Sequence, residues 1–167
     1  NSNSLDSFTE EQWDLDIAVG LKGSFFCTKH YGSLISKNIN GGSIVNISSD
    51  LGLIAPDQRI YAENSGSNKV SQYKPVSYSV VKSGIIGLTR YTSTFWVNKN
   101  VRCNAICPGG IYTNQSKSFL KKLNFRIPMG RMAKVSEYRG TLIWLLSDAS
   151  SYSTGSVIAV DGGRTAW

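Results

Sequence analysis

Short β-branched segments alternate with longer segments of helical periodicity along this chain of 167 residues, and the alternation limits the folds that it can form. Apolar segments bounded by glycine or proline are typical of buried strands, which we expect at residues 43–48, 101–107 and 156–160. Strands that are joined through helices pair in parallel by right-handed crossovers. The pattern therefore predicts an α/β fold, with helices on both faces of a parallel sheet.

Three longer helices and one short helix are predicted around these strands. Thr9 and Gln12 form a capping-box pattern, in which two side chains satisfy free amides at a helix start, and the helix that follows runs to about residue 36. The other helices are expected at residues 76–97, 117–123 and 136–146. The residues predicted to face the core are Trp13, Ile17, Leu21 and Phe25 in the first helix, Val81, Ile85, Leu88, Phe95 and Trp96 in the second, and Tyr138, Leu142, Leu145 and Leu146 in the last.

Composition argues against several classes of protein. No apolar run approaches the ~20 residues of a membrane-spanning helix, and the polar start lacks signal-peptide character. The three cysteines form no Cys-x-x-Cys pair, and their odd number argues against a secreted disulfide framework, so we expect a cytoplasmic protein. One histidine leaves no His-rich metal site, and the net charge of +7 is spread along the chain rather than concentrated as in nucleic-acid binders. We expect no metal, nucleic acid or membrane partner.

Residues 78–82 carry the pattern Tyr-x-x-x-Lys at the start of the second long helix. Spacing of four places the Tyr78 and Lys82 side chains on one helix face, one turn apart. An ammonium beside a phenol favours the phenolate, and a tyrosine in that setting can give or take a proton at working pH. By itself, however, Tyr-x-x-x-Lys often occurs by chance on helices, and the simplest interpretation is a pair of side chains on the protein surface.

The surrounding motifs change that interpretation. In parallel sheets ligands bind at the carboxyl ends of the strands, where Ser48, Ser49 and residues 108–113 are expected. Motifs in a fixed order cover nearly the whole chain: Gly42-Ser-Ile-Val-Asn-Ile-Ser-Ser49, Tyr78-x-x-x-Lys82, Val101-Arg-x-Asn104-x-x-x-Pro108-Gly109, Ile127-Pro-Met-Gly-Arg131, Leu146-Ser-Asp148, Thr154-Gly155 and Val160-Asp-Gly-Gly163. With these motifs the sequence resembles the short-chain dehydrogenase/reductase family.

The resemblance implies a Rossmann-like, doubly wound fold and hydride transfer between NAD or NADP and a carbon that bears oxygen. Tyr78 would be the acid/base for the substrate oxygen, Lys82 would hold the nicotinamide ribose, and Ser49 would donate a hydrogen bond to the substrate oxygen. The long helices would pair between subunits, as a homotetramer or homodimer. The residues that would contact the cofactor are Tyr78, Lys82, Pro108, Gly109, Ile111 and Thr113.

Three other residues receive no chemical role. Asn104 is expected to be structural, while Cys103 and Cys107 are expected to fill the core.

Two departures from the family pattern concern the site itself. The family usually has Asn, which supports a proton-relay water, at the place that Gly20 occupies in Gly20-Leu-Lys-Gly23. Residues 50–77 are expected to form an extended loop on the substrate side, because residues 59–73 make the stretch between Ser49 and Tyr78 longer than usual. A polar wall there favours a polyhydroxylated or charged substrate, and its side chains would be Tyr61, Glu63, Asn64, Asn68 and Gln72.

A third departure concerns the cofactor. The family's glycine-rich phosphate turn, its ribose selector and its Asn-Asn-Ala-Gly strand all precede the part of the pattern found in this chain, which starts without Met. The βαβαβ half that carries them takes about 60–90 residues. We therefore expect residues 1–167 to be a single partial domain, the C-terminal part of a longer enzyme.

The sequence predicts an NAD(P)-dependent oxidoreductase that interconverts a secondary alcohol and a ketone, with a polar, sugar-like small molecule as the preferred substrate. A 3-oxoacyl-(acyl carrier protein) reductase is the alternative within the enzyme class. A non-catalytic scaffold or truncated fragment is the alternative outside it. Gly20 and the lack of a phosphate turn favour that alternative, while the set of Ser49, Tyr78 and Lys82 opposes it.

Overall fold

The computed structural model describes residues 4–61 and 72–167. The described residues form a three-stranded parallel sheet of β1 (Gly42–Ile47), β2 (Val101–Pro108) and β3 (Val157–Val160), in the order β1-β2-β3. β1 pairs with β2 from Gly42↔Val101 to Ile47↔Ile106, and β2 pairs with β3 from Ala105↔Val157 to Pro108↔Val160. The predicted parallel sheet is confirmed, and the predicted strand bounds agree closely with the observed ones.

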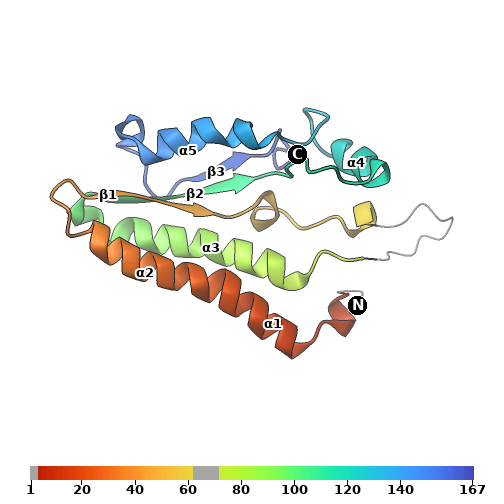
Figure 1. Cartoon of the computed structure of the whole chain (residues 1–167), viewed down its shortest axis with the longest axis horizontal. Coiled ribbons are helices and arrows are strands. Elements are labelled where there is room, and N and C mark those ends of the chain that lie inside the picture. Colours follow the sequence, from red (N-terminus) through yellow and green to blue (C-terminus); the bar gives the residue numbers. More distant parts are fainter. Residues whose placement is uncertain (1–3, 62–71) are drawn as a thin grey trace.

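Helices cover both faces of this sheet (Figure 1). On one face, α1 (Glu10–Ile17), a π-helical turn (Ala18–Lys22) and α2 (Gly23–Ile35) form a continuous rod beside α3 (Val76–Phe95). On the other face lies α5 (Arg139–Leu146), and α4 (Lys117–Asn124) lies beyond the strand ends. Short 3₁₀ turns occupy Leu5–Ser7, Asp50–Gly52, Gln58–Tyr61, Val97–Lys99, Val135–Tyr138 and Asp148–Ser150. The doubly wound arrangement is thus confirmed.

Small residues make the contact between the first helical rod and α3. A Cβ built on Gly20 would meet Val81 Cγ1 at 2.6 Å, and one on Gly32 would overlap the ring of Trp96. Phe25, by contrast, is 46% exposed, so the prediction that it faces the core is wrong. Close approach of the two helices requires small side chains at the contact, and the larger ring of Phe25 points outward.

Two other core predictions, for Phe95 and Leu146 at the ends of their helices, are also wrong. Phe95, in the last turn of α3, is 57% exposed, and the buried face of that turn carries Thr92 and Ser93 instead. Leu146, the last residue of α5, is exposed while Leu145 is fully buried. The spacing of large apolar residues therefore predicted the helices correctly, but it did not predict which residues are buried at the ends of those helices.

The start of α1 confirms half of the predicted capping box. The Thr9 hydroxyl accepts a hydrogen bond from the backbone N–H of Gln12 at 3.3 Å. The Gln12 side-chain amide donates to Asp16 Oδ1 at 2.8 Å instead of returning to Thr9, so the reciprocal bond is absent from this helix start.

β2 is the centre of the core, and Cys103 and Cys107 on it are fully buried. Asn104 is fully buried too, and its side chain donates to the Ser153 carbonyl at 2.8 Å and accepts from the Ser156 N–H at 3.0 Å. These bonds tie β2 to the segment that leads into β3. The structural role of Asn104 and the core positions of both cysteines are confirmed.

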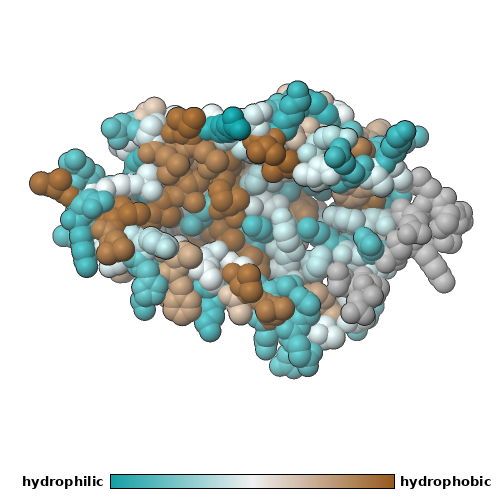
Figure 2. All heavy atoms as spheres, in the orientation of Figure 1, coloured by the Kyte–Doolittle hydropathy of each residue, from teal (hydrophilic) through white to brown (hydrophobic). Residues whose placement is uncertain are grey.

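β1 has a strand neighbour on one side only within residues 4–61 and 72–167. Its last residue, Ile47, is 48% exposed. Figure 2 shows apolar side chains gathered over this side of the molecule, where β1 runs between α5 and α3. In the described parts of the chain, no helix has the length and apolar character needed to cross a membrane.

Candidate active site

Tyr78 lies in the first turn of α3, with two lysine side chains near its ring. The Lys74 Nζ is 3.6 Å from the centroid of the Tyr78 ring, and the Lys82 Nζ is 5.7 Å from it. An ammonium over an aromatic face is attracted by the electron density of the ring. Sequence reasoning identified Lys82 and missed Lys74, which lies just before the start of α3, where helical spacing gives no information.

Lys82 connects α3 to the carboxyl end of β1. Its Nζ donates to the Ile47 carbonyl at 3.1 Å, and the Ser48 hydroxyl donates to the Lys82 carbonyl at 2.7 Å. Burial lowers the pKa of Lys82, and the nearby Cys107 thiol partly opposes that shift. Ser48, to which sequence analysis gave no role, therefore holds in place the helix turn that carries Lys82.

Ser49 is buried two residues after the end of β1 and caps the turn Asp50–Gly52. Its hydroxyl donates to Asp50 Oδ1 at 2.9 Å and accepts from the Leu51 N–H at 3.2 Å. The other oxygen of Asp50 accepts from Arg164 at 2.6 Å. Asp50 and Arg164 lie far apart in the sequence, and no local pattern connects them, so sequence analysis missed both.

Tyr78 and Lys82 line the same open cavity, of about 450 Å³. Gly20 lines it as well, and it lies within the π-helical turn, a kind of turn that is frequent at functional sites. Ser49 is not among the lining residues. The remaining residues of this cavity are Asp16, Val19, Ser24, Ile47, Lys74, Pro75, Ser77, Val81 and Ile85.

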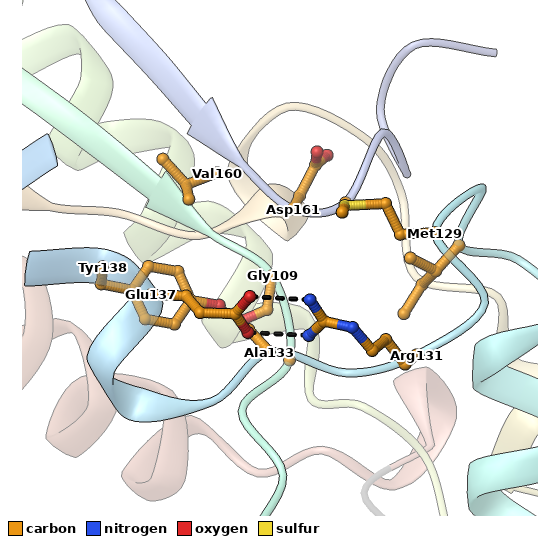
Figure 3. Close-up of a pocket in the computed structure, with 11 residues that line it drawn as sticks. Gly109, Met129, Arg131, Ala133, Glu137, Tyr138, Val160 and Asp161 are labelled. Carbon is orange, nitrogen blue, oxygen red and sulfur yellow. Dashed lines mark hydrogen bonds and ion pairs between the residues drawn. The ribbon is translucent and has the colours of Figure 1, made fainter. Parts of the chain in front are cut away.

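Gly109 lines a different cavity, of about 80 Å³, at the ends of β2 and β3 (Figure 3). The Tyr138 hydroxyl donates to the Gly109 carbonyl at 3.0 Å. Arg131 donates to both carboxylate oxygens of Glu137 at 2.7 Å, and these bonds lower the pKa of Glu137 to about 2. An ion pair thus occupies one wall of this second cavity.

The other predicted cofactor residues line neither of these two cavities. Pro108 ends β2 opposite Val160, and Ile111 forms an isolated bridge with Ala133. The Thr113 hydroxyl accepts a hydrogen bond from the Gln115 amide at 2.9 Å. The structure therefore brings Tyr78 and Lys82 together, but the six predicted cofactor residues do not share one cavity.

Of the predicted polar wall, only part belongs to the described residues. Tyr61 packs against Phe119 with 5.6 Å between ring centroids, and Gln72 is exposed. Glu63, Asn64 and Asn68 lie outside the described residues.

Comparison with known proteins identifies the class. A sequence profile for the family described as enoyl-(acyl carrier protein) reductase matches residues 1–165. The chain is 37% identical over 158 residues to the 3-oxoacyl-(acyl-carrier-protein) reductase FabG of Thermotoga maritima, an alignment that covers 92% of this chain and 57% of that protein.

Two solved structures are similar over almost the whole chain. A short chain dehydrogenase from Leptospira borgpetersenii with bound NAD+ has a TM-score of 0.86 and 32% identity, covering 96% of this chain and 59% of that one. A gluconate 5-dehydrogenase from Burkholderia cenocepacia, in complex with NADP and tartrate, has a TM-score of 0.85 and 25% identity, covering 100% of this chain and 61% of that one.

A parallel sheet between two helical layers, with Tyr78 and Lys82 near the carboxyl end of a strand, defines the class as Rossmann-like α/β proteins. The chain belongs to the short-chain dehydrogenase/reductase family. It spans 57–61% of the length of the relatives described above.

Proposed function

We propose that the protein is an NAD(P)-dependent oxidoreductase that interconverts a secondary alcohol and a ketone. The observation that carries this proposal is the placement of Tyr78 and Lys82 on one cavity, with the Lys82 ammonium 5.7 Å from the Tyr78 ring centroid. The Tyr78 hydroxyl exchanges a proton with the substrate oxygen.

Ser49 is the proposed second contact to the substrate oxygen. Its hydroxyl would exchange the bond to Asp50 for one to the substrate, and that donor would stabilise the charge that develops on the oxygen. The buried Asp50 carboxylate, held by Arg164, keeps the Ser49 side chain in one orientation until substrate arrives.

The residues around Tyr78 fit the ribose end of a nicotinamide cofactor. The Lys82 ammonium has three N–H donors and gives one to the Ile47 carbonyl, which leaves two for ribose hydroxyls. Pro108, Gly109, Ile111 and Thr113 are the proposed border of the nicotinamide. When bound, the cofactor supplies or accepts the hydride. The NAD+ and NADP in the two related structures support this choice.

A polar, sugar-like molecule is the preferred substrate. Ser24, Ser77 and Lys74 offer polar groups on the cavity wall, and residues 50–77 are the proposed substrate-side loop. The similarity to a gluconate 5-dehydrogenase that holds tartrate supports the same choice. A 3-oxoacyl-(acyl carrier protein) reductase is the second candidate, favoured by the identity to the Thermotoga reductase and by the apolar Val19 and Ile47 on the wall.

The proposed assembly is a homodimer or homotetramer in the cytoplasm. Exposed aromatic side chains on α2 and α3 offer surface for pairing between subunits: Phe25, Phe26, Tyr91 and Phe95. All three cysteines are free, which agrees with a reducing compartment. We further propose that residues 1–167 are part of one larger domain, whose other strands pair with the open, apolar edge of β1.

The Tyr78→Phe variant tests the proposed function, in the protein expressed from its complete coding sequence. Turnover of alcohols and ketones, followed by nicotinamide absorbance with NAD(H) and NADP(H), should fall by about 10²–10⁴-fold, because the proton donor is lost. Tyr152→Phe, a change of the same kind at an exposed position that lines neither cavity described above, should leave turnover unchanged. A Tyr78→Phe protein as active as the wild type contradicts the mechanism, and a folded wild-type protein that neither binds the cofactor nor turns over alcohols or ketones supports the scaffold alternative.

A further inference from the structure

We infer that Lys74 binds the carboxylate of a sugar-acid substrate, directly beside Tyr78. The inference rests on the proposed function, because it names the substrate class of the same site.

The backbone of Lys74 is held on both sides by one side chain. The Lys74 N–H donates to Gln58 Oε1 at 2.9 Å, and Gln58 Nε2 donates to the Lys74 carbonyl at 3.1 Å. A side-chain amide that both accepts from and donates to one residue fixes that residue much as a paired strand would. The backbone of Lys74, just before the start of α3, is therefore fixed in position.

Gln58 begins the turn Gln58–Tyr61, and contacts with other parts of the chain hold this turn in place. Ile60, two residues further on, is buried in an apolar cluster with Leu123, Ile127 and Met132. On the other side of Gln58, the Asp57 carboxylate accepts from Arg126 Nε at 2.6 Å. These contacts attach the turn Gln58–Tyr61 to α4 and its C-terminal extension, so that Lys74 is held in place through the core of the molecule.

The Lys74 ammonium lies against the Tyr78 ring, at 3.6 Å from its centroid, and lines the cavity that Tyr78 and Lys82 share. No carboxylate among the described residues forms an ion pair with it. Burial lowers the pKa of Lys74, and the charge of Asp50 opposes this shift. A partly desolvated ammonium without a paired anion gains most from a ligand that brings one.

The carboxylates near Lys74 are already engaged. Asp50 accepts hydrogen bonds through both oxygens, from Ser49 and from Arg164. Asp16, the acidic residue on the cavity wall, accepts from Gln12 through one oxygen and from Ser77 through the other. The cavity thus presents two ammonium groups and one satisfied carboxylate, a balance that favours an anionic ligand.

The position of the ammonium selects the kind of anion. Because Lys74 contacts the ring of the tyrosine that acts on the substrate hydroxyl, the anionic group must lie only a few atoms from the reacting carbon. A carboxylate on a short polyhydroxylated chain meets that requirement. A 3-oxoacyl thioester carries uncharged methylene groups near its ketone and would leave the ammonium without a partner.

D-gluconate and D-glucitol provide a matched pair of substrates, because they differ by a carboxylate in place of a hydroxymethyl group. In the protein expressed from its complete coding sequence, Lys74→Met should raise the KM for D-gluconate about 10- to 100-fold, the loss expected for a charge-assisted hydrogen bond, and leave the KM for D-glucitol unchanged. Lys74→Arg should retain most of the affinity. The control Lys121→Met, which removes the same charge at an exposed position of α4, should change neither KM.

A binding measurement without turnover separates this inference from the proposed function. Calorimetric titration of D-gluconate into the Tyr78→Phe protein should show binding that Lys74→Met weakens by a similar factor. Such binding without turnover in the wild-type protein would support the carboxylate site and contradict the oxidoreductase. Absence of binding, or equal affinity with and without Lys74, overturns the inference even if the enzyme oxidises other alcohols.

Discussion

The Arg164 guanidinium donates a hydrogen bond to the Asp50 carboxylate at 2.6 Å, and the two side chains are only 8% and 4% exposed. The same carboxylate accepts, through its other oxygen, from the Ser49 hydroxyl and from the Leu51 N–H. The segment after β3 is thereby tied to the turn that carries Ser49. A buried ion pair of this kind is costly to break, since the remaining charge loses its partner in a medium of low polarity.

Arg164→Met should therefore lower the free energy of unfolding by about 3–5 kcal/mol, because it leaves the Asp50 carboxylate buried and without its ion-pair partner. Urea unfolding followed by circular dichroism measures the change. The double variant Asp50→Asn with Arg164→Met should recover part of the loss, since neither charge then remains. If the effects of the two single changes simply add, the two side chains do not stabilise each other.

Two glycines in the helical layer should respond in opposite ways to the same substitution. At Gly87, in the middle of α3, a Cβ would meet no atom within 4 Å apart from its chain neighbours and the nearby backbone of its own helix, so Gly87→Ala should stabilise the protein by about 0.5–1 kcal/mol. At Gly20 a Cβ would lie 2.6 Å from Val81 Cγ1. Gly20→Ala should therefore destabilise the protein by about 1–3 kcal/mol, more than the gain in helix propensity.

The same unfolding measurement checks both glycine variants. Combining Gly20→Ala with Val81→Ala should reduce the loss below the sum of the two single effects, because the smaller side chain makes room for the methyl group. A Gly20→Ala protein as stable as Gly87→Ala would show that the rod and α3 are not in close contact. The contact also gives a physical reason why no larger residue, such as Asn, fits at Gly20.

Local sequence signals predicted the sheet and the long helices because hydrophobic periodicity and flanking glycines report on burial within one element. The same signals were weaker where two elements meet. The place of Phe25 was mispredicted because the buried residues of α2 are Thr28 and Gly32, the latter against Trp96 just after α3, and their small size rather than hydrophobicity determines the packing.

The candidate site shows the same difference between residues of one element, which were predicted, and contacts between elements, which were not. Tyr78 and Lys82 were predicted because both lie on one helix and their spacing carries the information. The partners that hold them are distant in the sequence: the Ser48 hydroxyl bonds the Lys82 backbone, and the Gln58 side chain bonds the backbone of Lys74, 16 residues further on. Such bonds depend on how the loop after β1 folds back on α3, and a single sequence does not encode that path in any local pattern.

Alkaline pH should destabilise the protein through Cys103. Burial raises the pKa of the Cys103 thiol from 9.0 to about 12, and a hydrogen bond with Thr92 opposes this only in part. Between these two values the unfolded chain releases a proton that the folded chain retains, so the stabilisation is complete below pH 9 and is lost as the pH rises towards 12. This thiol should lower the free energy of unfolding by up to about 1.4 kcal/mol for each pH unit in that range.

Urea unfolding at a series of pH values from neutral to alkaline measures that slope. Cys103→Ala should make the decline above pH 9 shallower than in the wild-type protein, because the buried titrating group is gone. Cys27→Ala is the matched control, since Cys27 is an exposed free thiol and should leave the slope unchanged. Equal slopes in the two variants would mean that Cys103 ionises as readily in the folded protein as in the unfolded chain, which its complete burial on β2 argues against.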